Sequence, residues 1–419
     1  MSSDTAENVP PSCWEYCPQE LLWLFFKYVK SDLKSLLTCM TVNQRWKNLV
    51  IDFIECQRLW PKIVTGALVN RGCSFQRKTN LDPKKLVFNS MLWNFGGLAK
   101  VALHHVYEVE DVTHMYIYKD RLILKTDAEV TYFDVKSTKK IKSHLSTGEA
   151  DYVENDHMVV ITLENDNLLG DIYLYGKPEP DSTIYDTTKE NDLYVMRNIQ
   201  VYGLEDDICY MVTDRNVVWA LIWDRKQWSL KMRGRYYGDV GKKICALNIH
   251  DNRVTMATEL GSMWREDANF VKFSKISDIS SSVQLPSMNS GWALFNEADV
   301  AMPVPKRIPR ITAYHNTKLD QMRLECSEMT CATPHGEVLF LGFEDGTVIV
   351  CRPRAHPTSP QPDIIIHVQD LDRTIEDPTI VALEVFEAEM CHHLFVATTE
   401  KVLQLVITYP DSIIKEYFE

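Results

Sequence analysis

The chain of 419 residues has 45% hydrophobic and 25% charged residues, a composition typical of globular proteins, so we expect most of it to fold. The length exceeds that of one ordinary compact core and predicts two or three domains or one large ring-like architecture. The net charge of −13 argues against a nucleic-acid partner, because neutralising phosphates needs a surplus of Lys and Arg.

The sequence has no apolar run of about 18 residues and no basic start followed by an apolar stretch. We therefore expect neither a membrane span nor a signal peptide, and a location in the cytosol or nucleus. The 11 cysteines are scattered without a CxxC pair, as is typical of reduced thiols. Three Cys or Cys-His clusters lack a matching second pair at zinc-finger spacing, so we interpret them as thiols and expect no metal and no cofactor. They are Cys13/Cys17, Cys326/Cys331 and Cys391-His392-His393.

Residues 1–13 are predicted to be a disordered N-terminus, and a helix is predicted to follow them. Pro18 presets the first helical turn, and Glu20 meets the positive end of the helix dipole. The helix is expected to end near Val29. It is apolar nearly all round, which indicates that it is covered on more than one side.

Two further short helices are predicted by their capping residues. Ser31 or Asp32 is expected to cap the second helix, and Thr41 with Gln44 has the spacing of a capping box that opens the third. A core of this size is marginal without a partner or a neighbouring domain. If four or five large side chains stay exposed, covering them contributes roughly 6 to 15 kcal/mol, against an association cost of about 4 to 15 kcal/mol. The helices are therefore expected to cover another surface.

The order of residues 17–60 resembles the F-box, whose pattern is a Leu-Pro or similar start, an acid-Leu-Leu helix, an Asp-Leu second helix and an Arg-Trp in the third. The spacing holds through all three helices without a gap. The matching elements are Cys17-Pro18, Glu20-Leu21-Leu22, Phe25, Tyr28-Val29, Asp32-Leu33, Leu36, Val42, Arg45-Trp46 and Leu59-Trp60.

The resemblance implies an adaptor-binding role for these helices. In the F-box family they bury apolar side chains against a Skp-type adaptor, which joins the receptor to a cullin and a RING protein. Pro18 and Leu21 are the stronger contact candidates, and Trp46 is a candidate for the interior of the helical domain. The alternative is an ordinary helical cap packed on the larger domain. The resemblance assigns adaptor contact, or support of the contacting helices, to Pro18, Leu21, Leu22, Phe25, Leu33, Leu36 and Trp46.

Residues 82–97 predict a connecting helix. Asp82 is expected to cap it, and Pro83 occupies the first helical position. Gly96 is expected to end the helix by adopting the left-handed conformation. An apolar face at helical spacing, from Phe88 to Phe95, is expected to dock on the domain that follows and make the joint semi-rigid.

From about residue 112 short β-branched or alternating runs replace helices. Equivalent positions recur with a mean step of about 45 residues, which is typical of β-propeller blades. Asp345-Gly346 is expected to form a tight hairpin turn. The domain distantly resembles the WD-repeat propellers, with a lone WD dipeptide at Trp223-Asp224. The seven predicted strand pairs lie in 115–135, 157–176, 208–224, 252–265, 291–305, 337–353 and 393–407.

Seven blades is the best count, with six or eight as alternatives, and a pair of β-sandwiches is the rival architecture. Loops at 177–192, 272–290 and 352–363 are expected on the rims, where partners bind, but the sequence selects no individual substrate-binding residue. The basic stretches 231–243 and 305–310 are either solvated loops or sites for an acidic or phosphorylated peptide.

We found no nucleophile elbow, phosphate-binding glycine loop or HExxH helix, and we expect a non-catalytic protein. The predicted fold class is α+β multidomain, with a three-helix F-box at 14–62, a helical connector at 63–111 and an all-β propeller at 112–419. The expected function is that of the substrate receptor of a Skp-cullin-F-box ubiquitin ligase, with a target protein on the propeller. A non-ligase scaffold with the helices as a structural cap is the alternative.

Overall fold

The structure is a computed structural model, and the chain forms two compact units, Met1–Val69 and Asn70–Glu419. We call them the helical unit and the sheet unit. The structure describes residues 17–64, 79–145, 151–154, 158–162, 170–174, 199–205, 208–213, 216–223, 228–236, 244–250, 253–258, 262–267, 273–278, 292–294, 301–303, 329–335, 338–352 and 362–418.

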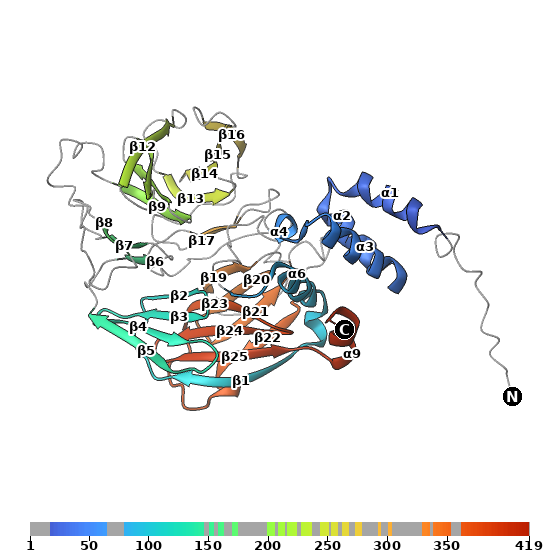
Figure 1. Cartoon of the computed structure of the whole chain (residues 1–419). Coiled ribbons are helices and arrows are strands. Elements are labelled where there is room, and N and C mark those ends of the chain that lie inside the picture. Colours follow the sequence, from blue (N-terminus) through green and yellow to red (C-terminus); the bar gives the residue numbers. More distant parts are fainter. Residues whose placement is uncertain are drawn as a thin grey trace. The chain divides into compact units, whose positions relative to one another are not determined.

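The described part of the helical unit consists of short helices joined by tight turns (Figure 1). The first ends at Val29, as predicted. Asp32, not Ser31, caps the second, because its Oδ1 accepts a hydrogen bond from the Ser35 amide at 3.3 Å. The helices are α1 (Gln19–Val29), α2 (Leu33–Thr38), the 3₁₀ turn η1 (Cys39–Thr41), α3 (Gln44–Cys56) and α4 (Trp60–Ile63).

The predicted capping box at Thr41 is wrong. Thr41 ends η1, and its hydroxyl donates to the Thr38 carbonyl at 2.9 Å. Asn43 is the actual N-cap of α3: its backbone is extended, and its Oδ1 accepts from the Trp46 amide at 2.9 Å. The extra 3₁₀ turn delays the start of the helix until Asn43 can accept that bond.

The connecting helix α6 (Pro83–Leu92) begins as predicted, with the Asp82 carboxylate accepting from the Lys85 amide at 3.1 Å. The predicted end of the helix at a left-handed Gly96 is wrong, because α6 ends at Leu92 and a 3₁₀ segment, η3 (Trp93–Leu98), follows it. A side chain at Gly96 would place its Cβ 2.9 Å from the Asp363 Cβ. Glycine is therefore needed here for a close approach and not for a positive φ.

The apolar face of the connector docks on the sheets, as predicted. Phe88 and Leu92 are buried, and Leu92 with Trp93 belongs to a large core cluster of the sheet unit. Helix α6 contacts both β23 (Ile380–Ala388) and α9 (Asp411–Phe418). The connector is therefore part of the sheet unit.

The described part of the sheet unit contains seven separate antiparallel sheets (Figure 1). Three of them consist of consecutive strands early in the unit: β2 (His114–Tyr118), β3 (Arg121–Lys125), β4 (Glu129–Asp134) and β5 (Lys140–Leu145); β6 (Asp151–Glu154), β7 (Met158–Thr162) and β8 (Gly170–Leu174); β9 (Ile199–Glu205), β10 (Ile208–Thr213), β11 (Val217–Trp223) and β12 (Trp228–Arg235). Three more follow: β13 (Ile244–His250), β14 (Arg253–Thr258), β15 (Ser262–Glu266) and β16 (Phe273–Asp278); β17 (Trp292–Leu294) and β18 (Ala301–Pro303); β19 (Met329–His335), β20 (Val338–Phe343), β21 (Thr347–Cys351) and β22 (Ile364–His367), which the short helix α8 (Val368–Leu371) follows.

The seventh sheet joins distant parts of the chain. Its order is β1-β25-β24-β23, so β1 (Lys100–Tyr107) pairs with β25 (Val402–Thr408), and β24 (Cys391–Thr398) lies next to it. The strand-rich part therefore begins before the predicted boundary at 112. A register shift between Leu103 and His105 interrupts the alternation of β1, which hides it in the sequence.

Each of the seven predicted ranges contains a hydrogen-bonded antiparallel pair, and each pair is in a different sheet. The range 115–135 contains three strands, β2, β3 and β4, instead of the predicted two. The Asp345-Gly346 turn between β20 and β21 is confirmed, with Gly346 at φ +78°. Of the predicted rim loops, 273–278 is in fact strand β16, while 177–192 and 353–361 lie outside the described residues.

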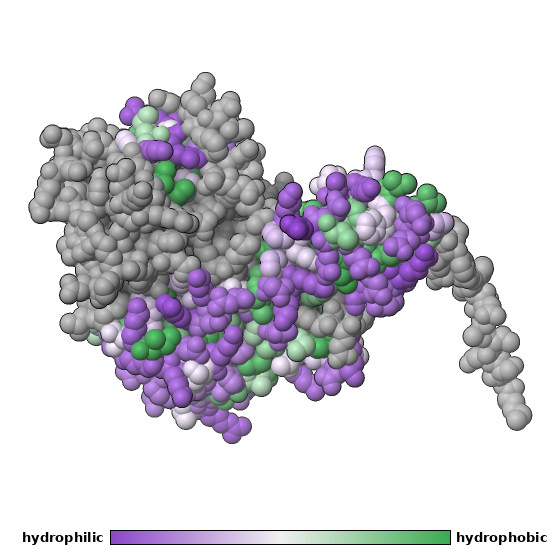
Figure 2. Space-filling view, in the orientation of Figure 1, coloured by the Kyte–Doolittle hydropathy of each residue, from purple (hydrophilic) through white to green (hydrophobic). Residues whose placement is uncertain are grey.

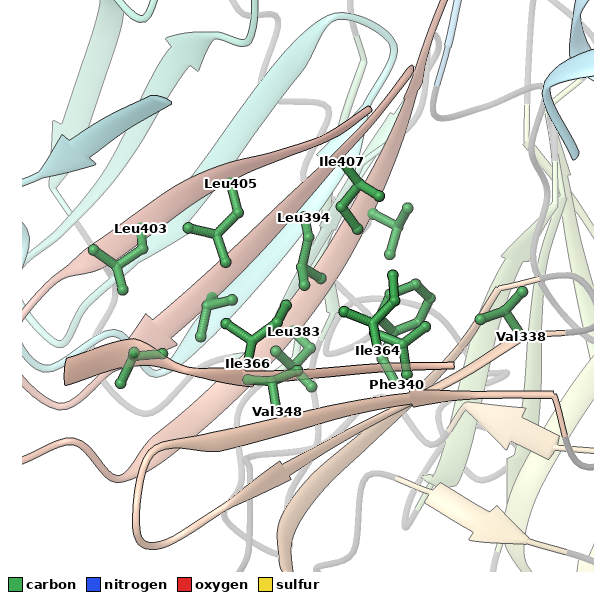
Figure 3. Close-up of a cluster of buried hydrophobic side chains, with 14 of the residues drawn as sticks. Val338, Phe340, Val348, Ile364, Ile366, Leu383, Leu394, Leu403, Leu405 and Ile407 are labelled. Atoms are coloured by element: carbon green, nitrogen blue, oxygen red, sulfur yellow. The ribbon is translucent and has the colours of Figure 1, made fainter. Parts of the chain in front are cut away.

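Neighbouring sheets contact one another through edge strands, which in most sheets are the first in chain order. Contacts join β9 to β13, β13 to β18, β17 to β19, β19 to β23, β23 to β2 and β2 to β6. Apolar cores lie between sheets: Figure 3 shows side chains of β20–β22 and of β23–β25 pointing toward one another. A second core joins β2–β3 to β23–β25, and a third joins β10–β11 to β13–β14. None of the described helices is long and apolar enough to span a bilayer.

A candidate protein-binding surface on the helical unit

Backbone bonds fix the start of α1. Pro18 is the N-cap, and its carbonyl accepts from the amides of Leu21 at 3.1 Å and Leu22 at 3.2 Å. The Arg45 guanidinium on α3 donates to the Cys17 carbonyl at 2.6 Å. This charge-assisted bond ties the entry of α1 to the third helix.

One face of α1 packs on an aromatic core. Leu22 and Phe26 are fully buried, and the Phe26 ring lies 5.7 Å from that of Trp46 and 5.8 Å from that of Phe53, centroid to centroid. Trp23 meets Phe53 edge to face at 5.6 Å. Such aromatic pairs contribute about 0.5–1.5 kcal/mol each beyond their buried area, so this face holds the helical unit together.

A second apolar face of α1 is exposed. Leu21, Leu24, Phe25 and Tyr28 are 55%, 59%, 37% and 87% exposed, and they follow the i, i+3, i+4, i+7 spacing of one helical face. We call these four residues the α1 stripe. Figure 2 shows apolar, green surface on the segment that carries α1, among polar atoms. An amphipathic helix normally buries its apolar face, so the α1 stripe is a surface that another molecule can cover.

The predicted adaptor-binding residues divide by burial. Leu22, Leu36 and Trp46 are buried, so their side chains support the helices. Phe25 contributes both to the exposed surface and to the packing of the helices, because it is partly exposed and its ring lies 5.8 Å from that of Trp46. In the remaining three positions Pro18 and Leu21 are exposed and Leu33 is half-buried.

The residue pattern of the F-box did not single out Leu24, although the spacing from Leu21 was a signal that it shares the exposed face. Tyr28 was part of the quoted pattern but not of the predicted site, and it is the most exposed residue of the α1 stripe. Val42 is also exposed, at 54%, and lies outside α1. Among the described residues of the helical unit, five large apolar side chains are thus exposed, as many as the association estimate assumed.

In the described part of the basic stretch 231–243, Lys231 and Arg235 are exposed, whereas Arg233 is bound within the sheet unit. Arg233 lies on β12, and its Nε and Nη2 donate to the two carboxylate oxygens of Glu266 at 3.0 and 3.2 Å. Glu266 is buried and also accepts from the Val254 amide. The Arg233 guanidinium is therefore already bound to a carboxylate. The remaining basic residues, in 237–243 and 305–310, lie outside the described residues.

The Cys391-His392-His393 cluster does not form one centre. His392 Nδ1 lies 2.8 Å from Glu387 Oε2, whereas His393 Nδ1 lies 2.6 Å from Gln404 Nε2 on the other face of the strand. Burial raises the pKa of the Cys391 thiol to about 11. Among the described residues, no group of three or more His, Cys, Asp or Glu side chains is arranged to hold a metal ion.

No family model matches the chain, and no curated protein matches it. Among solved structures, a computationally designed protein called Ika8 is 10% identical and covers 74% of this chain and 99% of its own, with a TM-score of 0.41. The β-propeller domain of Myceliophteria thermophila Cps50 (Swd1) is 8% identical and covers 74% of this chain and 100% of its own, with a TM-score of 0.44. Both TM-scores are below 0.5.

Proposed function

We propose that this chain is the substrate-recognition subunit of a Skp-cullin-F-box ubiquitin ligase. The helical unit binds a Skp-type adaptor, the sheet unit binds a target protein, and a cullin with a RING protein joins through the adaptor. The subunit is not an enzyme: it raises the effective concentration of a target lysine beside the conjugating machinery.

We also propose that the sheet unit is a closed seven-bladed β-propeller, with each sheet as one blade. The series of contacts between edge strands of successive sheets supports this proposal, because one edge strand of each blade lines the central channel of a propeller. The pairing of β1 with β25 supports it as well, since a blade built from both ends of the domain completes the ring. A propeller carries its connections on two rims, and these are surfaces for protein partners.

The single observation that carries the adaptor proposal is the α1 stripe. Four large side chains on one face are exposed, while the opposite face is fixed by its contacts with α3. Covering them contributes roughly 1.5–3 kcal/mol for each side chain that is fully buried, which is sufficient for a specific interface once polar contacts are added. An F-box has the same order of residues and uses such a surface for its adaptor.

Calorimetric titration of the full chain with a Skp-type adaptor tests this function. The Leu21→Asp/Phe25→Asp double variant places two carboxylates in the α1 stripe, and we expect it to lose adaptor binding because desolvating them is costly. Gln19→Asp/Lys27→Asp is the matched control: it changes two exposed residues of the same helix outside the stripe, and we expect it to keep binding.

Circular dichroism must show that both double variants remain folded. No binding by the folded wild-type chain would exclude the receptor role, and the non-ligase scaffold, with the helices as a structural cap, would then be the better interpretation. Binding retained by the stripe variant but lost by the control would place the adaptor on another face of α1.

A further inference from the structure

A pocket of about 520 Å³ opens between two neighbouring sheets of the sheet unit. The connection from β1 to β2 contributes Glu110, Asp111 and Val112, and the β3–β4 turn contributes Asp127 and Ala128. Val381 on β23 lies on the other side. All these segments are described, and all belong to one compact unit.

Hydrogen bonds hold the walls of this pocket in place. The Asp111 amide donates to the Thr399 carbonyl at 2.9 Å, which joins the β1–β2 connection to the β24–β25 turn. The Thr113 amide donates to the Lys125 carbonyl at 2.8 Å, and the Thr126 hydroxyl accepts from the Ala128 amide at 3.2 Å. The pocket is therefore preformed, which lowers the entropic cost of filling it.

The pocket combines an apolar floor with free carboxylates. Val112 is buried and Val381 half-buried, so their methyl groups form an apolar floor. Glu110, Asp111 and Asp127 are exposed, and within the described part of the chain none of the three carboxylates has a hydrogen bond or an ion pair. A long aliphatic side chain with a cationic head matches both features, because its stem covers apolar surface while its head stays near anions.

The edge of the sheets around the pocket is strongly acidic. Backbone amides of Glu376 and Asp377 donate to the Glu400 carboxylate at 3.1 and 2.8 Å, and the Thr379 hydroxyl donates to the Glu344 carbonyl, so the turns on this edge are contiguous. Within the connections 108–113, 126–128, 344–346, 368–379 and 399–401, the acidic residues are Glu108, Glu110, Asp111, Asp127, Glu344, Asp345, Asp370, Asp372, Glu376, Asp377 and Glu400.

In the same connections the cationic side chains are Arg373 and Lys401. Lys401 Nζ is already bound, at 2.8 Å from the Thr374 hydroxyl and 3.4 Å from Asp372 Oδ2. The turns at the other ends of the same strands have mixed charge. They carry Lys119 and Asp120 between β2 and β3, Lys136 and Lys139 between β4 and β5, and Glu389 between β23 and β24. The negative field is therefore concentrated at the pocket edge, where it attracts cations.

We propose that this edge binds a lysine- or arginine-rich extended segment of the target protein, with one basic side chain in the pocket. The stem of that side chain lies on Val112 and Val381, and its head is bound by Glu110, Asp111 and Asp127. The neighbouring turns bind the flanking basic residues. This proposal rests on the proposed function and adds the chemistry of the target; it predicts a basic recognition segment, and not a phosphorylated one.

Fluorescence anisotropy of a short labelled peptide of alternating lysine and glycine, titrated with the full chain, tests the proposal. We expect saturable binding that weakens as ionic strength rises, and no binding of the matching glutamate–glycine peptide. Glu110→Gln/Asp111→Asn/Asp127→Asn should weaken binding about tenfold, the sum of three modest charge contacts. Glu20→Gln/Asp52→Asn/Asp411→Asn removes the same charge from exposed positions elsewhere, and it should leave binding within about twofold of the wild type.

Ala128→Trp fills the pocket at an exposed turn without changing charge, and it should weaken binding as much as the pocket triple variant does. Equal weakening by both charge variants would show attraction to net charge alone and overturn the proposal, as would unchanged binding by Ala128→Trp. Adaptor titration of the same variants keeps the two proposals apart: adaptor binding should persist in all pocket variants, whether or not the peptide binds.

Discussion

Glu387 is the centre of a buried polar cluster that joins the connector to the sheets. Its Oε1 lies 2.5 Å from His335 Nε2 on β19, and its Oε2 lies 2.8 Å from His392 Nδ1 on β24. The Asn89 amide on α6 donates to the same carboxylate, and the Trp93 indole stacks on His392 at 3.9 Å. These side chains are almost completely shielded from water, so the carboxylate depends on protein partners to replace its hydration.

The protonation of Glu387 links the stability of the sheet unit to pH. Burial by itself would raise the pKa of Glu387, but the electrostatic interaction with His392 and the hydrogen bonds with His335 and His392 outweigh it and hold the pKa well below its usual range. The unfolded chain therefore binds the proton more tightly than the folded chain does. The stabilisation is present above the ordinary glutamate value of 4.5 and is lost as pH falls toward the lowered value.

We therefore expect Glu387→Gln to lower the unfolding free energy at neutral pH by about 3–5 kcal/mol, because both histidines lose their anionic partner. The variant should also lose part of the acid dependence of the wild type below pH 4.5. Denaturant titrations across this range measure both effects. Glu389→Gln is the control: it removes an exposed ion pair with Lys85 and should change stability by less than about 1 kcal/mol. Parallel acid dependence of Glu387→Gln and wild type would contradict this account.

At the scale of the element, the start of α3 gives the clearest test of structure against sequence pattern. The Asn43 side chain accepts the Trp46 amide, whereas the Thr41 hydroxyl donates to a carbonyl of the preceding turn. We expect Asn43→Ala to destabilise the helical unit by about 0.5–2 kcal/mol, as the loss of an N-cap does. Thr41→Ala should cost less. Thermal unfolding of both variants, followed by far-ultraviolet circular dichroism, measures the difference, and a larger effect at Thr41 would restore the capping box.

Strands that pair with a neighbour in the sequence are predicted better than strands that pair with a distant segment. The seven strand pairs are local, since each consists of two runs joined by one short connection, and the pattern of each run identifies it; the Asp345-Gly346 turn also marks its position. Strand β1 pairs with a strand at the other end of the sheet unit, and no nearby residue signals that partner. Strand β16 carries Ser, Lys and Asp, so its polar sequence is typical of a loop.

The candidate sites also differ in whether they come from one local element or from distant segments. Leu21 and Phe25 were predictable because one helix places them on one face, and the resemblance to the F-box added Pro18. Local pattern does not tell which of Leu21 and Leu22 is exposed, since that depends on which face of α1 packs on α3. The acidic pocket was not predictable, because Glu110, Asp127 and Val381 come from three separate connections or strands that only the fold brings together.

At the scale of the whole molecule, the pairing of β1 with β25 makes both ends of the sheet unit necessary for one sheet. Four apolar residues of β25, namely Val402, Leu403, Leu405 and Ile407, are fully buried. They lie in the two cores that flank this sheet, on the β20–β22 side and on the β2–β3 side. Loss of β25 therefore opens two cores and also leaves β1 without a partner in the described sheets.

A chain that ends after Thr398 is therefore expected not to fold in its sheet unit. The four lost side chains contribute roughly 6–12 kcal/mol by burial alone, which is comparable to the whole stability of a typical domain, about 5–15 kcal/mol. A chain that ends after Tyr409 keeps β25 and loses α9, whose contact with the cores runs through Ile413 and Ile414, so it should stay folded with a lowered unfolding midpoint. Limited proteolysis and thermal unfolding distinguish the two truncations. A folded sheet unit without β25 would mean that β24 and β1 tolerate unpaired edges, and closure by the chain ends would then not be required.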